Sequence, residues 1–185
     1  MTMLHNRWPA SLVVPAIIVI YTAAFVASNT YIFEDLRLPV VWLGSGVMVT
    51  GLLMLRYRFW PVLLTLAAAV DIALAFFKYQ VGTVTFLTAL LPSLASHIEP
   101  VVIAIAMRHL FPKNWSLSNL SGAISLVAAC VCAAVLSGTA AGIVGYDESS
   151  NVSRVNMAFR WTLCGLAGTP LVLWLVNGVV EMVST

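Results

Sequence analysis

The chain has 185 residues, of which 61% are hydrophobic and 9% are charged. A soluble domain of this length does not hide so much apolar surface, so most of the chain is expected to lie in a membrane. The formal net charge of +2 is too small for a nucleic-acid-binding surface. The first apolar run is long and lacks a small-residue cleavage site, so no cleavable signal peptide is expected.

Six apolar stretches follow one another along the chain, and each is predicted to be a transmembrane helix. They cover residues 9–30, 39–55, 60–77, 84–111, 117–145 and 155–180. The loops between them are short, so consecutive helices are expected to be antiparallel neighbours. The prediction is therefore an all-α, polytopic membrane protein that forms a single domain over residues 1–185.

The positions of Lys and Arg indicate the orientation of these helices. With the N-terminus inside the cell, the cytoplasmic segments hold Arg7, Arg56, Arg58, Arg108 and Lys113. The outer side then holds Arg37, Lys78, Arg154 and, just inside the membrane edge, Arg160. The excess on the inner side favours this orientation, and six crossings also place the C-terminus in the cytoplasm.

The fourth stretch carries a carboxylate at a depth where it is costly. Glu99 must face the protein interior, find a partner or take a proton. Ser96 precedes it by three residues and shares its helix face. Pro92 and Pro100 each remove an N–H and free the carbonyl four residues back, so kinks are expected there. His97 is a proton carrier, a ligand contact, or a histidine bonded across helices.

Two further ionisable residues lie in the outer half of the predicted membrane region. Asp71 precedes Lys78 by seven residues, and Arg160 lies at a comparable depth in the sixth stretch. We hypothesise that Asp71 and Arg160 form a buried ion pair, because each alone is expensive there; Arg160 could instead extend outward to the interface. Trp42 and Trp161 either belong to an outer aromatic belt or line a pocket that opens outward.

The fifth stretch is rich in small residues. Gly138 and Gly142 allow two backbones to approach closely, with packing inside the chain favoured over a homodimer face. The three cysteines lie in apolar runs and are interpreted as buried hydrophobic residues. No cluster has metal-ligand spacing, and no catalytic motif is present, so neither a metal site nor enzymatic activity is predicted.

Four short motifs occur together over roughly residues 39–174. They are Trp42-Leu-Gly-Ser-Gly46, Arg56-Tyr-Arg-Phe-Trp-Pro61, Glu99-Pro-Val-Val-Ile-Ala-Ile-Ala-Met-Arg-His109 and Gly165-Leu-Ala-Gly-Thr-Pro170. In order and spacing they resemble the first family of MASE-type membrane-associated sensor domains. The chain has Gly44 where the family usually has Pro, Val70-Asp71 where it often has Gly-Asn, and Ser96 where it has Asn.

The resemblance implies a sensor of the bacterial inner membrane, whose ligand and cofactor it leaves unknown. Domains of this kind precede diguanylate cyclase, phosphodiesterase or histidine kinase modules and pass a signal to them. The expected partners are therefore the lipid bilayer and a cytoplasmic output module, either attached after the C-terminus or carried by another protein.

A pocket in the outer half of the helices is the expected binding site of this sensor. Its candidate residues are Trp42, Asp71, Ser96, His97, Glu99, Arg160 and Trp161. An alternative remains open at this point: a substrate-capture subunit of a vitamin importer would have the same size, helix number and broken polar helices.

Overall fold

The computed structural model describes residues 9–29, 32–33, 38–39, 41–78, 86–109, 120–144 and 153–184. In this part of the chain there are six α-helices and one pair of two-residue strands, and the short helix η2 precedes α3. The helices are α1 (Ala10–Ser28), α2 (Gly44–Met54), α3 (Trp60–Lys78), α4 (Phe86–His109), α5 (Leu120–Val144) and α6 (Arg154–Ser184). The strands β1 (Ile32–Phe33) and β2 (Leu38–Pro39) pair antiparallel, and η2 spans Tyr57–Phe59.

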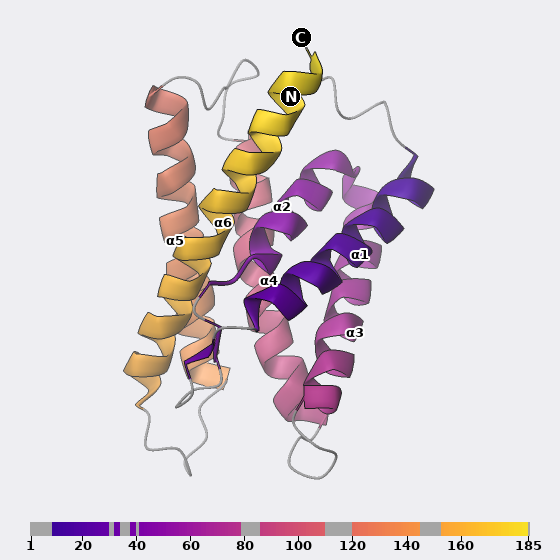
Figure 1. Cartoon of the computed structure of the whole chain (residues 1–185). Helices are drawn as coiled ribbons and strands as arrows, with labels where there is room; N and C mark the ends of the chain where they lie inside the picture. Colours follow the sequence, from indigo (N-terminus) through magenta and orange to yellow (C-terminus); the bar gives the residue numbers. More distant parts are fainter. Residues whose placement is uncertain are drawn as a thin grey trace.

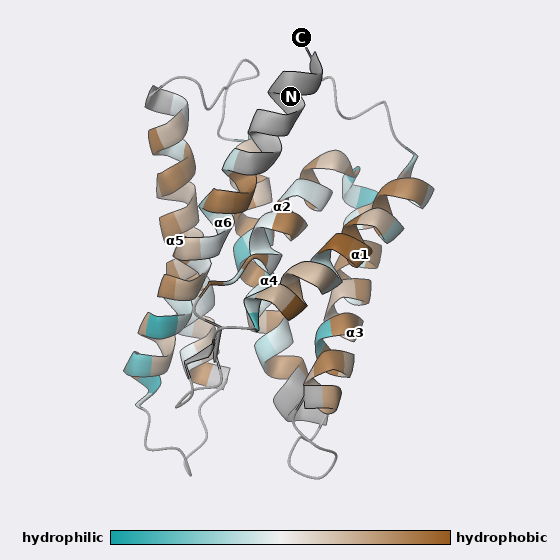
Figure 2. Cartoon of the chain, in the orientation of Figure 1, coloured by the Kyte–Doolittle hydropathy of each residue, from teal (hydrophilic) through white to brown (hydrophobic). Residues whose placement is uncertain are grey.

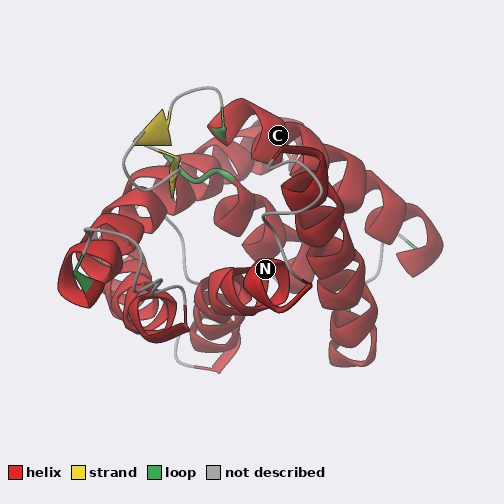
Figure 3. Cartoon of the chain, turned by 90° about the horizontal axis from the view of Figure 1, so that it is seen from below, coloured by secondary structure: helices red, strands yellow, loops and turns green. Residues whose placement is uncertain are grey.

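The helices alternate in direction, so that α1 begins and α6 ends at the same end of the bundle (Figure 1). Helix α6 packs against α5 and α2, while α4 lies against α2, α3 and α5. In the view along the bundle, the helices lie side by side and the two short strands lie at the edge (Figure 3). Helices α2 and α4 run in the same direction, a point on which the site depends.

Among the described residues, four helical segments are long and apolar enough to cross a membrane. They are Ala10–Ser28, Tyr57–Phe77, Leu90–His109 and Gly122–Ile143. Apolar residues dominate these helices (Figure 2), and many large ones, among them Val19, Val62 and Ile124, are exposed. This supports the predicted helical membrane protein.

Helix α2 is shorter than the predicted span of residues 39–55. Its 11 residues rise about 16 Å at 1.5 Å each, roughly half the thickness of the hydrocarbon core. Residues 41–43 lie against α6 instead of continuing the helix, because the Trp42 N–H donates to the Cys164 carbonyl at 3.1 Å. At Gly168 a β-carbon would overlap the Trp42 backbone, so glycine is needed for this approach.

Helix α4 runs as one element through both Pro92 and Pro100. The two prolines therefore do not end the helix, although each still removes a backbone donor. Its residues contact three different helices, which makes α4 the common element of the polar contacts described below.

The packing of α5 on α6 accounts for the small residues of the fifth stretch. A β-carbon at Gly138 would overlap Thr162 and the Ala158 carbonyl, and one at Gly142 would lie 2.9 Å from the Ala158 β-carbon. The two glycines are thus used inside the chain. This face is occupied by α6 and is not available to a second copy.

Candidate functional site

The carboxylate of Glu99 joins three helices in the centre of the molecule. Its side chain is 2% exposed, and it comes from α4. The Ser45 hydroxyl of α2 donates to Oε2 at 3.2 Å, and the Thr169 hydroxyl of α6 donates to Oε1. Both carboxylate oxygens are therefore hydrogen-bonded by protein, which offsets the cost of burying them. We call Glu99, Ser45 and Thr169 the Glu99 junction.

Glycine 165 brings the backbone of α6 directly against this carboxylate. A β-carbon at this position would overlap Glu99 Oε2 and lie 3.0 Å from its Cδ. Any side chain at 165 would thus displace either the carboxylate or α6. The motif that contains Gly165, Gly168 and Thr169 therefore shapes the α6 side of the junction.

The junction also places a carboxylate beside the first turn of α2. The N-terminus of a helix carries partial positive charge from its unpaired N–H groups, so an acidic group is favourable there. Ser45, which donates to Glu99, belongs to this first turn, and both residues are buried. Just ahead of the helix, the Leu43 N–H donates to the Ser28 hydroxyl at 3.0 Å.

The other end of α2 is held by a second residue of α4. Arg108 donates to the carbonyls of Leu52 at 2.8 Å and Leu53 at 3.1 Å, and also to that of Leu55. These are the last carbonyls of the helix, which have no partner within it, and a cation is favourable beside them. The Trp60 indole N–H also donates to the Leu52 carbonyl, at 2.8 Å. Because α2 and α4 are parallel, Glu99 and Arg108 match the two poles of α2, and we call this pair of contacts the α4 clamp.

Asp71 of α3 is the centre of a separate buried cluster. The Tyr21 hydroxyl of α1 donates to Oδ1 at 2.8 Å, and the Ser93 hydroxyl of α4 donates to Oδ2 at 3.0 Å. His97 Nδ1 lies 3.9 Å from Oδ2. Asp71 is 7% exposed and Tyr21 is 2% exposed. The Asp71 cluster, formed by these four residues, thus joins α1, α3 and α4.

The hydrogen bonds of His97 fix which of its nitrogens is available. Nδ1 lies 2.6 Å from the Ser93 carbonyl, which can only accept, so Nδ1 carries a hydrogen. Ser96 donates its own hydroxyl to the same carbonyl at 2.7 Å. Nε2 is buried and has no hydrogen-bond partner among the described residues. In the neutral ring this nitrogen is an acceptor that faces the protein interior.

The hypothesised ion pair between Asp71 and Arg160 is wrong. Asp71 is bound by residues of α1 and α4, whereas Arg160 Nε donates to Asn156 Oδ1 one turn earlier on α6, at 3.2 Å. The hydroxyls of Tyr21 and Ser93 supply the donors that the hypothesis assigned to the guanidinium. The buried Asp71 carboxylate therefore has its hydrogen bonds without a cation from α6.

The two predicted tryptophans are both half-buried and lie in different contacts. Trp161 Nε1 donates to the Ser137 hydroxyl of α5 at 3.1 Å, and that hydroxyl donates to the Ala95 carbonyl at 2.9 Å. The Trp42 ring meets Phe25 edge-on, with centroids 5.2 Å apart. Each tryptophan therefore links helices, and the seven predicted site residues do not come together in one pocket.

Sequence reasoning missed several partners of the two carboxylates. Tyr21, Ser45 and Thr169 are single polar residues in apolar helices, and all are 2% exposed or less. Such isolated polar side chains at membrane depth are the signal that could have identified them, because each needs a buried partner. The spacing of these three residues in the sequence does not indicate which carboxylate each of them contacts.

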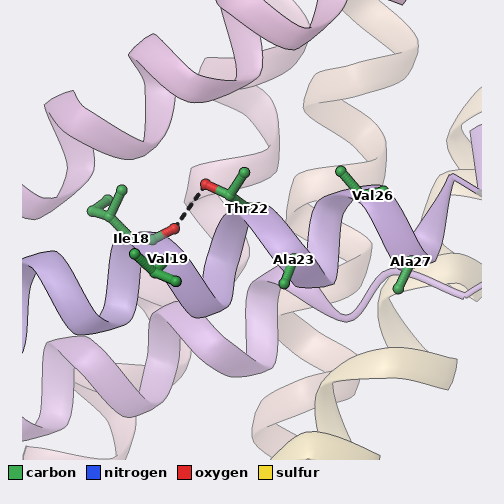
Figure 4. Close-up of a pocket in the computed structure, with 6 residues that line it drawn as sticks. All are labelled: Ile18, Val19, Thr22, Ala23, Val26 and Ala27. Carbon is green, nitrogen blue, oxygen red and sulfur yellow. Dashed lines mark hydrogen bonds between the residues drawn. The ribbon is translucent and has the colours of Figure 1, made fainter.

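A shallow apolar groove lies on the outer face of α1, away from both carboxylates. It is lined by Ile18, Val19, Thr22, Ala23, Val26 and Ala27 (Figure 4). Its one polar side chain, Thr22, donates to the Ile18 carbonyl of its own helix at 2.8 Å. The hydroxyl hydrogen of Thr22 is therefore used within α1 and is not offered to a ligand in the groove. Among the described residues, no three His, Cys, Asp or Glu side chains are grouped as metal ligands.

Apolar spans around buried, mutually bonded polar side chains define a helical membrane protein. The family model for MASE1 matches residues 12–183, nearly the whole length. The chain therefore belongs to the MASE1 family of membrane-associated sensory domains, and the resemblance seen in the short motifs is confirmed. No curated protein and no solved structure shows a significant match to the chain.

Proposed function

We propose that this chain is a six-span sensor of the bacterial inner membrane that passes its signal through α6 to a cytoplasmic output. The output is a diguanylate cyclase, phosphodiesterase or histidine kinase module, attached after the C-terminus or carried by a partner. Membership of a sensory family supports the role. Because α1 begins and α6 ends at one end of the bundle, both ends are expected on one side of the membrane, and the Lys and Arg distribution favours the cytoplasm as that side.

The Glu99 junction is the observation that carries this proposal. One carboxylate is bonded to α2 through Ser45 and to α6 through Thr169 at the same time. A shift of α4 or α2 therefore changes the position of α6, whose last turns lead toward the output. Two arrangements of these packed helices, with different affinity for the signal, are what a sensor of this kind requires.

The α4 clamp makes α2 and α4 move together. Arg108 holds the last carbonyls of α2, and Glu99 faces its first turn. Breaking the Arg108 end would remove a donor from backbone carbonyls, and breaking the other end would remove one from the buried Glu99 carboxylate, which is unfavourable in an apolar surrounding. The pair then moves as one unit, and its contacts with α6 at Thr169 and Gly165 pass that movement on.

The Asp71 cluster is the part that responds to the signal in this proposal. It joins α1 and α3 to α4, and the buried His97 Nε2 would accept from a ligand that enters the cluster with an O–H or N–H donor. Binding there would alter α4, which also carries Glu99. The signal would thus pass along one helix from the Asp71 cluster to the junction.

A matched pair of threonine substitutions tests the proposal. For this test, a diguanylate cyclase module is fused in frame to the C-terminus of the chain, and the cellular concentration of cyclic di-GMP is measured. Thr169→Val removes the donor to Glu99, whereas Thr139→Val changes an exposed threonine that bonds only the Val135 carbonyl of its own helix. We expect Thr169→Val to shift the output severalfold and Thr139→Val to leave it unchanged.

Membrane abundance of both variants is measured in the same cells. Equal output from wild type and Thr169→Val, at equal abundance, would contradict transmission through the junction. Glu99→Gln serves as a second probe, because the amide keeps the shape of the side chain but changes what Ser45 and Thr169 bind.

A further inference from the structure

An exposed group of basic and aromatic residues lies at one end of the bundle. It consists of Arg56, Tyr57, Arg58 and His109, from the turn between α2 and α3 and from the last residue of α4. All four side chains are exposed, and Tyr57 is 46% exposed. We call them the Arg56 patch, which the sensory role described above does not use.

The patch is held in place by contacts among its own rings and the neighbouring helices. The Tyr57 hydroxyl lies 2.8 Å from His109 Nε2, and the two rings are stacked with centroids 6.1 Å apart. The Arg108 guanidinium lies 4.6 Å from the centre of the Tyr57 ring. Arg108 is itself fixed by the end of α2, so Tyr57 has a fixed position between Arg56 and Arg58.

The charge of the patch is not balanced by the acidic side chains that the structure describes. Asp71 and Glu99 are 7% and 2% exposed, and both are bonded inside the bundle. The two arginines therefore present positive charge at this end of the described structure. Guanidinium groups bind phosphate through two parallel hydrogen bonds, which makes a phosphate group a fitting partner.

The position of the patch indicates where that phosphate comes from. The apolar segments Tyr57–Phe77 and Leu90–His109 begin and end at these residues. The exposed ring of Tyr57 lies at this level, as aromatic residues do at the membrane–water interface. The patch is thus level with lipid headgroups, and an arginine there can contact a headgroup phosphate while its stem lies along apolar surface.

We propose that the Arg56 patch binds the headgroup phosphate of an anionic phospholipid. Arg56 and Arg58 contact the phosphate oxygens, and the exposed ring of Tyr57 lies beneath the headgroup. A basic side chain near an anionic lipid surface contributes about fivefold to binding. The two arginines together therefore favour an anionic over a zwitterionic lipid by roughly 25-fold.

Lipid retention measured by native mass spectrometry tests the proposal. The full chain is released from mixed micelles that contain equal amounts of phosphatidylglycerol and phosphatidylcholine. We expect the wild type to retain phosphatidylglycerol preferentially and Arg56→Gln/Arg58→Gln to lose most of that preference. Arg154→Gln/Arg160→Gln removes the same charge from the start of α6, and it should keep the preference.

Further variants separate a specific site from general attraction. Arg56→Lys/Arg58→Lys keeps the charge but not the paired hydrogen bonds, so an intermediate preference is expected. Millimolar inorganic phosphate should not displace the lipid, since it lacks the acyl chains. Equal loss in both glutamine pairs, or no preference in the wild type, would overturn the proposal without affecting the signalling role.

Discussion

The two buried carboxylates of this protein are held in different ways. Glu99 accepts from one hydroxyl on each oxygen and lies against the bare backbone of Gly165. Asp71 also accepts two hydroxyls, but the imidazole beside it keeps one nitrogen without a partner among the described residues. The Glu99 junction is thus fully satisfied, whereas the Asp71 cluster retains an unused hydrogen-bonding group.

In the proposed mechanism, this difference separates a structural joint from a responsive site. A satisfied buried network fixes the geometry of the helices that share it, because any movement leaves a polar group unpaired. An unpaired buried nitrogen is unusual in a native protein, and a water or a ligand that donates to it would account for it. Since His97 and Glu99 lie two residues apart on α4, the two regions face different helices but share one rigid element.

The largest effect is expected from a side chain at Gly165. Gly165→Val would force a β-carbon into the Glu99 carboxylate, and we expect a loss of about 3 kcal/mol in unfolding free energy. Denaturation of the purified protein in detergent measures it. Ala167→Val, on an exposed part of the same helix, is the control and should change stability little. Equal losses of unfolding free energy in both variants would show that the close contact between Gly165 and Glu99 matters no more than ordinary helix packing.

The partner of Asp71 can be identified by double-mutant cycles. Tyr21→Phe should destabilise by about 2 kcal/mol, because it removes a buried donor to a carboxylate. Combined with Asp71→Asn, its effect should be less than additive by about 1 kcal/mol. Arg160→Gln combined with Asp71→Asn should be additive within about 0.5 kcal/mol. Coupling to Arg160 rather than Tyr21 would contradict the observed cluster.

Substitution of Arg108, at the C-terminal end of α2, should lower stability less than the substitutions at Gly165 and Tyr21. Arg108→Gln removes a cation and its donors from the last carbonyls of α2, and about 1.5 kcal/mol of stability should be lost. Arg58→Gln, an exposed neighbour, should change stability by less than about 0.5 kcal/mol. Thermal unfolding in detergent compares the two. An effect at Arg58 as large as that at Arg108 would argue against the α4 clamp.

The smallest effect on stability is expected at His97. His97→Leu removes the unpartnered Nε2 and one of several donors to the Ser93 carbonyl, so we expect a change below about 1 kcal/mol. Its effect on signalling should be large by comparison, which cyclic di-GMP measured with an attached cyclase would show. A variant that folds and signals as the wild type does would remove His97 from the responsive site.

Several of these contacts could be anticipated from the sequence, and others could not. The burial of Asp71, His97 and Glu99 follows from the cost of ionisable groups at membrane depth. The error was to pair Asp71 with Arg160 on grounds of charge alone. Hydroxyl donors such as that of Tyr21 carry no charge, so charge compensation does not point to them, and only the structure shows which carboxylate each one meets.

The shortening of α2 has a similar origin. Residues 41–43 are apolar enough to extend the helix, and the local sequence gives no stop signal there. They leave the helix because Gly168 of α6 lets their backbone approach and the Cys164 carbonyl accepts from Trp42. That contact joins residues more than 120 positions apart, beyond the reach of local pattern.

The sequence by itself determined that this is a helical membrane protein with carboxylates inside, because the cost of polar groups in hydrocarbon depends only on residue type and depth. Short motifs were enough to identify its family. The tertiary structure decided which hydroxyl meets which carboxylate, and that α4 holds both ends of α2. These depend on close approaches between helices, where a missing β-carbon at Gly165 or Gly168 decides what can touch.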